Sequence, residues 1–104
     1  MAMGGFGNMQ NMLRQAQKMQ KELEEKQEEL ANTEIVGKVA GGMVEVTIFG
    51  DKTIDSIKIK PEAVDPDDIE MLEDLIVSAL NDAFTKADEL KEKLLGNMST
   101  KGLI

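Results

Sequence analysis

The spacing of hydrophobic residues changes twice along this chain, which separates two helical segments from a β-rich middle. Between residues 8 and 31, apolar side chains from Met9 to Leu30 recur at steps of three, four and seven. This spacing is typical of one stripe along a helix, and neither glycine nor proline interrupts it. We therefore expect one helix over residues 8–31, preceded by a mobile glycine-rich segment at residues 1–7.

The middle of the chain is rich in β-branched residues that partly alternate with polar ones, which predicts strands. Gly41 and Gly42 fit a two-residue hairpin turn, because primed turns need a positive φ that glycine tolerates. Residues 50–53 fit a second hairpin loop. The three antiparallel strands are expected at residues 33–40, 43–49 and 54–60.

The predicted sheet has apolar residues on both faces. One face would carry alternate residues of the second strand, beginning at Val44, with Ile57 and Ile59 as neighbours on the third strand. The other face would carry Val36, Met43 and Phe49. Because both faces then need cover, we expect helices on one face and a second protomer on the other face or at an edge.

A second helical stripe follows the strands. Asp65 could cap its start, Pro66 suits the first helical position, and Gly96 marks its expected end. Residues 97–104 are expected to be flexible. This order of elements predicts an α+β fold with a long N-terminal helix, a three-stranded antiparallel sheet and a long C-terminal helix, in which residues 1–104 form one domain.

Composition removes several classes of function. The 104 residues include no cysteine, histidine, tyrosine or tryptophan, so disulfides, thiolate metal sites and histidine catalysis are excluded. No apolar run approaches the ~20 residues of a membrane span, and the N-terminus lacks the features of a signal peptide. We therefore expect a cytoplasmic, non-enzymatic protein without a cofactor, a metal site, a membrane partner or a small-molecule substrate.

Charge is distributed unevenly along the chain. The net charge is −8, but residues 1–21 sum to +3 whereas residues 61–85 sum to −8. Within the first helix, Arg14, Lys18 and Lys21 precede a segment that carries five glutamates. The helix is therefore expected to have a basic outer half and an acidic half beside the sheet.

The expected element lengths make both helices project. Twenty-four helical residues span about 36 Å, whereas a seven-residue strand covers about 23 Å. The first helix would overhang the sheet by about two turns, and its projecting end would hold Arg14 and Lys18. The last helix would carry Lys86, Lys91 and Lys93 toward its own projecting end. In a simple meander, we expect the two tips on opposite sides of one protomer.

Alternatives remain open for these cations and for the methionines of the first helix. The cations could contact nucleic acid or merely solvate the surface, and Lys18 and Lys21 could each pair with the glutamate four residues later. The methionine stripe could pack in a core or dimer, or it could line a groove for a partner peptide. Its members are Met9, Met12 and Met19.

Three stretches together resemble a known family. They are "MLRQAQKMQKELEEKQEELA", "VAGGMVEVTIFGDKTIDSIKIKPEAV" and "DIEMLEDLIVSALNDAFTKADEL". In order and spacing, over residues 8–95, they are similar to the YbaB/EbfC family of bacterial nucleoid-associated proteins.

The resemblance implies a tweezer-like homodimer, whose sheets meet at the centre and whose helical arms project to bind double-stranded DNA. It further implies a place at the nucleoid and effects on nucleoid organisation and gene expression, including transcription regulation. Nothing resembles a helix-turn-helix unit, so we expect weak sequence preference. The alternative is a dimeric scaffold that binds another protein through its methionine-rich helices. By position, the DNA contacts would fall on Arg14, Lys18, Lys21, Lys86, Lys91 and Lys93.

Overall fold

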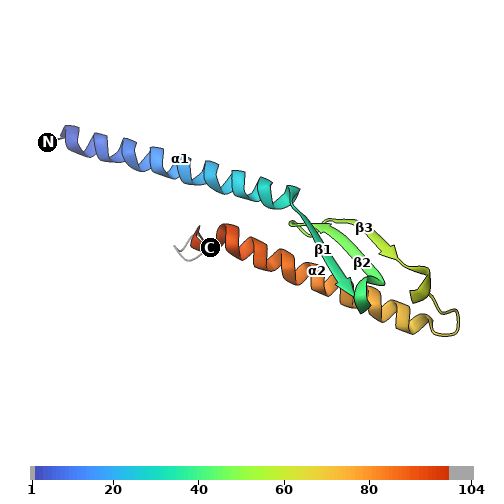
Figure 1. The fold of residues 1–104 in the computed structure, drawn as a ribbon. Helices are drawn as coiled ribbons and strands as arrows, with labels where there is room; N and C mark the ends of the chain where they lie inside the picture. Colours follow the sequence, from blue (N-terminus) through green and yellow to red (C-terminus); the bar gives the residue numbers. More distant parts are fainter. Residues whose placement is uncertain (1, 99–104) are drawn as a thin grey trace.

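Two long helices and a three-stranded sheet form an elongated molecule (Figure 1). The computed structural model describes residues 2–98, and it describes the side chains of residues 8–96. The principal extents of the molecule are 81 × 20 × 17 Å. The predicted α+β order of elements is confirmed. The helices are α1 (Ala2–Asn32) and α2 (Ile69–Met98), and the strands are β1 (Glu34–Val39), β2 (Val44–Phe49) and β3 (Ile54–Ile59).

The sheet is an antiparallel meander in the order β1-β2-β3, and its register follows the hydrophobic alternation. Val46 of β2 lies opposite Gly37 on one side and Ile57 on the other, while Val44 lies opposite Ile59. The side chains of Val44 and Val46 are completely buried. The predicted neighbours on β2 and β3 are therefore correct.

Helix α2 packs closely on the buried face of β1 and β2, because small residues line the contact. Ala79, Ala83 and Ala87 recur at i,i+4 spacing, and all three are buried. Gly37 lies directly beneath them, where an added Cβ would fall on the carbonyl oxygen of Ala79 and lie 2.8 Å from the Cβ of Ala83. The absence of a side chain at Gly37 thus sets the distance between helix and sheet.

The opposite face of the sheet is polar at its centre rather than apolar. Glu45 lies between Lys38 and Lys58 on the neighbouring strands, and its carboxylate is 4.0 Å from the Lys38 ammonium. Met43, which was expected on this face, packs instead against the buried core. Within the protomer, α2 packs on one face of the sheet, and cover of the other face or of an edge by a second protomer stays a prediction.

The first hairpin loop is longer than the two-residue turn that the glycine pair predicts. Val39 pairs with Val44, which leaves residues 40–43 as the loop. Gly41 and Gly42 do adopt positive φ values of 65° and 89°, but Ala40 does so as well, at 53°. The expected positive φ of the two glycines is therefore correct. The expected loop length is wrong because β1 ends one residue earlier, and β2 begins one residue later, than predicted. The second loop lies at residues 50–53, as predicted.

Helix α2 begins at Ile69, three residues after the predicted first position Pro66, and it ends beyond the predicted end at Gly96. Its N-terminal cap is Asp68, whose Oδ1 accepts a hydrogen bond from the backbone N–H of Met71 at 3.2 Å. The carboxylate of Asp65 instead accepts from the N–H of Asp67 in a local turn. At its other end, α2 continues past Gly96 to Met98.

Helix α1 also exceeds its predicted bounds, because it begins at Ala2 rather than at residue 8. A glycine costs ~1 kcal/mol relative to alanine in a helix interior, but each residue added to an existing helix also gains a backbone hydrogen bond. Residues 2–7 therefore extend the helix beyond its predicted start, and the mobility expected of this segment stays a prediction. Of the predicted flexible tail, residues 97 and 98 are helical, and residues 99–104 lie outside the described residues.

The two helix tips point to the same side of the protomer, which corrects the expected opposite placement (Figure 1). Three strands carry the chain from one end of the sheet to the other, so α2 starts at the far end from α1. It then runs back across the sheet, because its apolar face must be buried there. Its C-terminal part consequently reaches and contacts α1.

Candidate nucleic-acid interface

Helix α1 is an arm anchored only at its carboxyl end. Leu30 is buried there, and Gly50 at the end of β2 lies so close that an added Cβ would fall on the carbonyl oxygen of Leu30. From Asn8 to Lys18, every side chain is exposed. The arm consists of 31 residues and is therefore about 46 Å long, against about 20 Å for a six-residue strand. It projects further than the sequence predicted.

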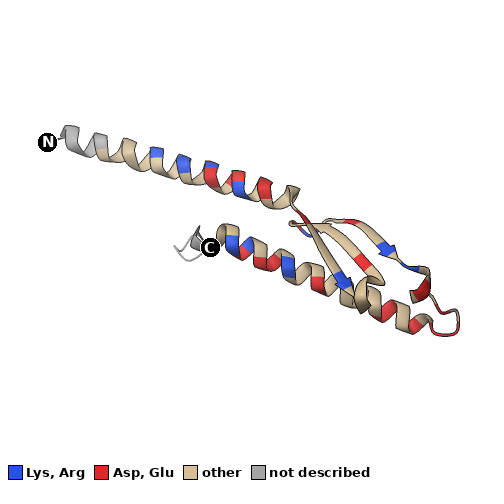
Figure 2. Cartoon of the chain, viewed as in Figure 1, with Lys and Arg blue, Asp and Glu red and all other residues tan. Residues whose placement is uncertain are grey.

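The two predicted basic groups lie on the same end of the protomer. Arg14, Lys18 and Lys21 are exposed on α1, and Lys91 and Lys93 are exposed near the C-terminal end of α2. Because α2 turns back toward α1, no partner subunit is needed to bring these groups to one side (Figure 2). We call these five residues the arm cations.

None of the arm cations lies within 4.0 Å of a carboxylate among the described side chains. Among the described side chains of residues 8–96, ion pairs within 4.0 Å join Lys38 to Glu45, Lys52 to Asp88 and Lys86 to Asp82. The i,i+4 pairs that Lys18 and Lys21 could form are therefore not made at this distance. The predicted cation set separates into five exposed arm cations and one engaged lysine, Lys86.

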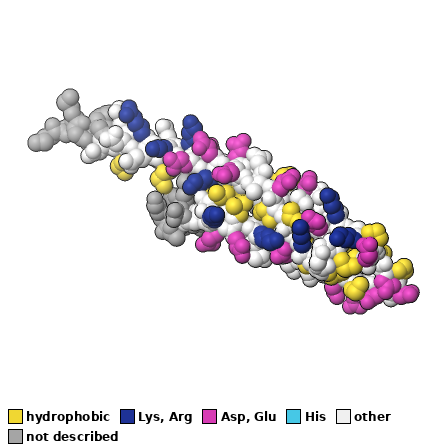
Figure 3. Space-filling view, viewed as in Figure 1, with side chains coloured by type: hydrophobic (Ala, Val, Ile, Leu, Met, Phe, Trp, Pro, Cys, Tyr) yellow, Lys and Arg dark blue, Asp and Glu magenta, His cyan; other side chains and the backbone are white. Residues whose placement is uncertain are grey.

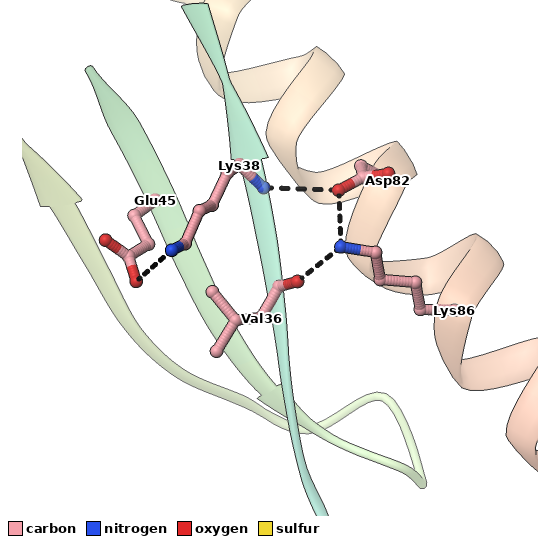
Figure 4. A network of polar contacts seen from close by, with 5 residues as sticks. All are labelled: Val36, Lys38, Glu45, Asp82 and Lys86. Carbon is pink, nitrogen blue, oxygen red and sulfur yellow. Dashed lines mark hydrogen bonds and ion pairs between the residues drawn. The ribbon is translucent and has the colours of Figure 1, made fainter. Parts of the chain in front are cut away.

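Lys86 is held in a polar network beside β1 (Figure 4). Its ammonium donates to the carbonyl oxygen of Val36 at 2.9 Å and lies 3.1 Å from a carboxylate oxygen of Asp82. That carboxylate also accepts the backbone N–H of Lys38 at 3.2 Å. The hydrogen bond from Lys86, and then the one from Lys38, hold the pKa of Asp82 below its ordinary value of 3.8.

Lys52 is a second engaged cation, and no pattern in the sequence indicates its role. It has a φ of 70° in the β2–β3 turn. Its ammonium lies 2.7 Å from the carboxylate of Asp88 and 5.8 Å from the ring centroid of Phe84. Both partners belong to α2, so Lys52 fastens the turn to the helix. The Asp51–Thr53 contact that shapes this turn lowers the pKa of Asp51.

A cluster of seven acidic residues lies at the opposite end of the molecule, in the connection after β3 and in the first turns of α2 (Figures 2 and 3). The cluster comprises Glu62, Asp65, Asp67, Asp68, Glu70, Glu73 and Asp74. Other acidic residues lie on the inner half of α1 and along the C-terminal half of α2. The net charge of −8 therefore hides a molecule with a cationic end and an anionic end.

The methionine stripe divides into an outer and an inner part. The side chains of Met9 and Met12 are 65% and 68% exposed, whereas Met19 and Leu23 are partly buried. The stripe therefore contributes packing toward the base of the arm and leaves an apolar surface toward its tip.

The described part of the chain has neither a cluster of metal ligands nor a membrane-spanning helix. Among these residues, no group of three or more metal-ligating side chains is placed to hold a metal ion. None of the helices described is both long enough and apolar enough to cross a membrane.

The fold is that of a small α+β protein whose helices project from the sheet and carry exposed cations. Such a protein is suited to contact a polyanion. The chain belongs to the YbaB/EbfC DNA-binding family, whose sequence model matches residues 4–103. It is 51% identical to a nucleoid-associated protein of Clostridium acetobutylicum, over 99% of this chain and 100% of that one. A nucleoid-associated protein of Lactococcus lactis is 48% identical, over 92% of this chain and 96% of its own.

A solved structure shares the fold. The crystal structure of an uncharacterized protein from Helicobacter pylori superposes with a TM-score of 0.72. It is 28% identical in sequence, and the match covers 84% of this chain and 91% of that one. The likeness supports the arrangement of two helices about a three-stranded sheet.

Proposed function

We propose that this protein binds double-stranded DNA at the nucleoid as a homodimer, through the projecting ends of its helices and with little sequence preference. The observation that carries the proposal is the set of five exposed arm cations, gathered at one end of the protomer without an ion pair among the described side chains. The names of the relatives support the same function. Effects on nucleoid organisation and gene expression would follow from this binding.

Distance explains how an acidic protein can bind a polyanion. The molecule is 81 Å long, and the Debye length at physiological ionic strength is about 8 Å. The acidic cluster at the start of α2 is therefore screened from DNA that lies along the arm tips. The local charge of the arms, rather than the net charge of the chain, decides the interaction.

Weak sequence preference follows from the kind of contact available. Lysine and arginine side chains on a projecting helix can reach phosphates, which position a protein without reporting the base sequence. Each neutralised phosphate releases counterions and lowers the slope of log K against log salt concentration by about 0.9. The affinity should therefore depend steeply on salt.

Titration of DNA by fluorescence anisotropy tests this function. Several unrelated duplexes of equal length should bind with dissociation constants that agree within about threefold, since backbone contacts dominate nonspecific binding. The absence of measurable duplex binding at low salt would contradict the function. Binding confined to one sequence would leave DNA binding in place but contradict the low specificity.

An uncovered apolar surface beside α2 supports the proposed homodimer. Helix α2 packs on β1 and β2 and has few contacts with β3, so Ile57 and Ile59 remain 43% and 38% exposed on the face that α2 covers elsewhere. Val77 is 54% exposed and lies two helical turns before Phe84, on the flank of α2 nearest the β2–β3 turn. Exposed apolar patches of this kind mark interaction surfaces.

Replacing Ile57 with lysine should weaken the homodimer. The substitution puts a charge into the proposed interface, and loss of a central contact costs about 2 kcal/mol, which is about 30-fold in the dissociation constant. Sedimentation velocity over a range of concentrations measures the effect. The matched control is Ser56→Lys, which puts the same side chain on the opposite face of β3. An unchanged dimer in the Ile57 variant would place the interface elsewhere.

The second candidate function is that of an adaptor for another protein. The exposure of Met9 and Met12 favours it, because methionine suits adaptable binding surfaces. The adaptor reading requires no nucleic acid, so the same anisotropy titration separates it from the DNA-binding function.

A further inference from the structure

The two edges of the sheet differ in their access to another strand. Alternate residues of an edge strand direct their backbone N–H and C=O groups outward. On β1, Thr33 and Gly50 are paired by a hydrogen bond, so Val36 and Lys38 are the central residues that face outward. On β3, the bond between Lys60 and Met43 leaves Ile57 and Ile59 facing outward.

The β1 edge is occupied by two side chains of α2 (Figure 4). Asp82 accepts the outward N–H of Lys38, and Lys86 donates to the outward carbonyl of Val36. The spacing of these four residues makes both contacts possible together. Residues i and i+4 of a helix are separated by about 6 Å along its axis, and residues i and i+2 of a strand by about 6.6 Å.

No corresponding contact protects the β3 edge. Among the hydrogen bonds of the described residues, none joins a side chain to the outward backbone groups of Ile57 or Ile59. Both residues also expose their apolar side chains at this edge. The sheet thus has one edge that a strand can join and one edge whose central groups are already bonded.

We propose that Asp82 and Lys86 are positioning residues that close the β1 edge, so that a second copy of this chain can join only at β3. An edge left open invites pairing with another chain. With both edges open, β3 of one copy could join β1 of the next, which is a head-to-tail contact that can repeat without limit. With only β3 open, the contact is self-complementary and closes as a pair.

The proposal rests on self-association of the chain and does not depend on DNA binding. It also assigns Lys86 a role different from the arm cations, because its ammonium bonds a backbone carbonyl of β1 and pairs with Asp82 of its own helix. Asp82 and Lys86 would thus limit assembly to a pair of chains. Their spacing in the sequence indicates only an ordinary i,i+4 ion pair.

Sedimentation of the full chain carrying Asp82→Ala and Lys86→Ala tests the proposal. The weight-average mass of this variant should rise about twofold or more as its concentration rises tenfold, because head-to-tail addition grows with concentration. The matched control is Glu22→Ala with Lys26→Ala, which removes an acid and a lysine at the same spacing on α1. The control should sediment like the parent protein.

The proposal would be overturned if the double variant sediments like the parent protein at every concentration. If the double variant loses its helical circular dichroism, the single Lys86→Ala variant is measured instead, since it leaves Asp82 on the Lys38 amide. Growth of that variant supports the proposal, and parent-like sedimentation overturns it. A monomeric parent would contradict the homodimer, while growth of the variant would still support the closed edge.

Discussion

Replacement of Arg14, Lys18 and Lys21 with glutamine should weaken duplex binding by about 100- to 1,000-fold at 0.1 M salt. The size follows from counterion release when one arm contacts the duplex, since three lost phosphate contacts change log K by about 2.7 between 0.1 M and 1 M salt. Glutamine keeps a high helix propensity, so the arm itself should persist. Anisotropy with one duplex at one salt concentration measures the loss directly.

The matched control removes three cations elsewhere. Replacement of Lys26, Lys58 and Lys60 with glutamine changes the net charge by the same amount but leaves the arm cations in place. Its affinity should stay within about threefold of the parent, because long-range charge is screened at this salt. An equal loss in both variants would mean that overall charge, and not the arm tip, governs binding.

Replacement of Gly37 with alanine should lower the free energy of unfolding by about 3 kcal/mol, the upper part of the range for overpacking a core. The new methyl group would meet the backbone of Ala79 and the nitrogen of Ala83, which is 2.7 Å from the Cβ position. Backbone atoms of a packed helix cannot swing aside as a side chain can, so α2 must shift off the sheet. Urea unfolding followed by circular dichroism measures the change.

Gly96→Ala is the control for Gly37→Ala, because the same chemical change meets open space. Its nearest neighbour would be a side-chain carbon of Glu92 at 3.9 Å, and the position lies inside α2. Alanine should therefore stabilise the helix by about 0.5–1 kcal/mol. Equal effects at the two glycines would show that the close approach at Gly37 does not limit packing.

Local periodicity was enough to predict the elements and the pairing of the strands. The alternation through Val44 and Val46 identified the buried face, and Ile57 and Ile59 followed as their neighbours. Register is well specified in such a case, because a slip of one residue would expose the whole apolar set.

The placement of the two helices relative to each other could not be predicted from the residue pattern of either helix alone. The side to which α2 runs depends on the number of strands and on the face that buries Ala79 and Ala83. The cap at Asp68 was missed because three aspartates shortly precede this helix, and propensity does not distinguish which one accepts the N–H of Met71.

The roles of individual lysines could not be predicted from the sequence either. Lys86 and Lys91 look alike in a helical pattern, but Lys86 faces the edge of β1 across fifty residues of chain. A lysine near the projecting end of a helix is thus only a candidate DNA contact until the fold shows which protein acceptors surround its ammonium group. The arm cations remain a prediction that binding measurements must test.

The salt dependence of DNA binding tests most directly whether the arms hold the phosphates. We expect the slope of log K against log salt concentration to be shallower by about 3 in the variant without Arg14, Lys18 and Lys21 if one arm contacts DNA, and by about 5 if both arms of a dimer do. A variant that keeps both the slope and the affinity of the parent would contradict the account.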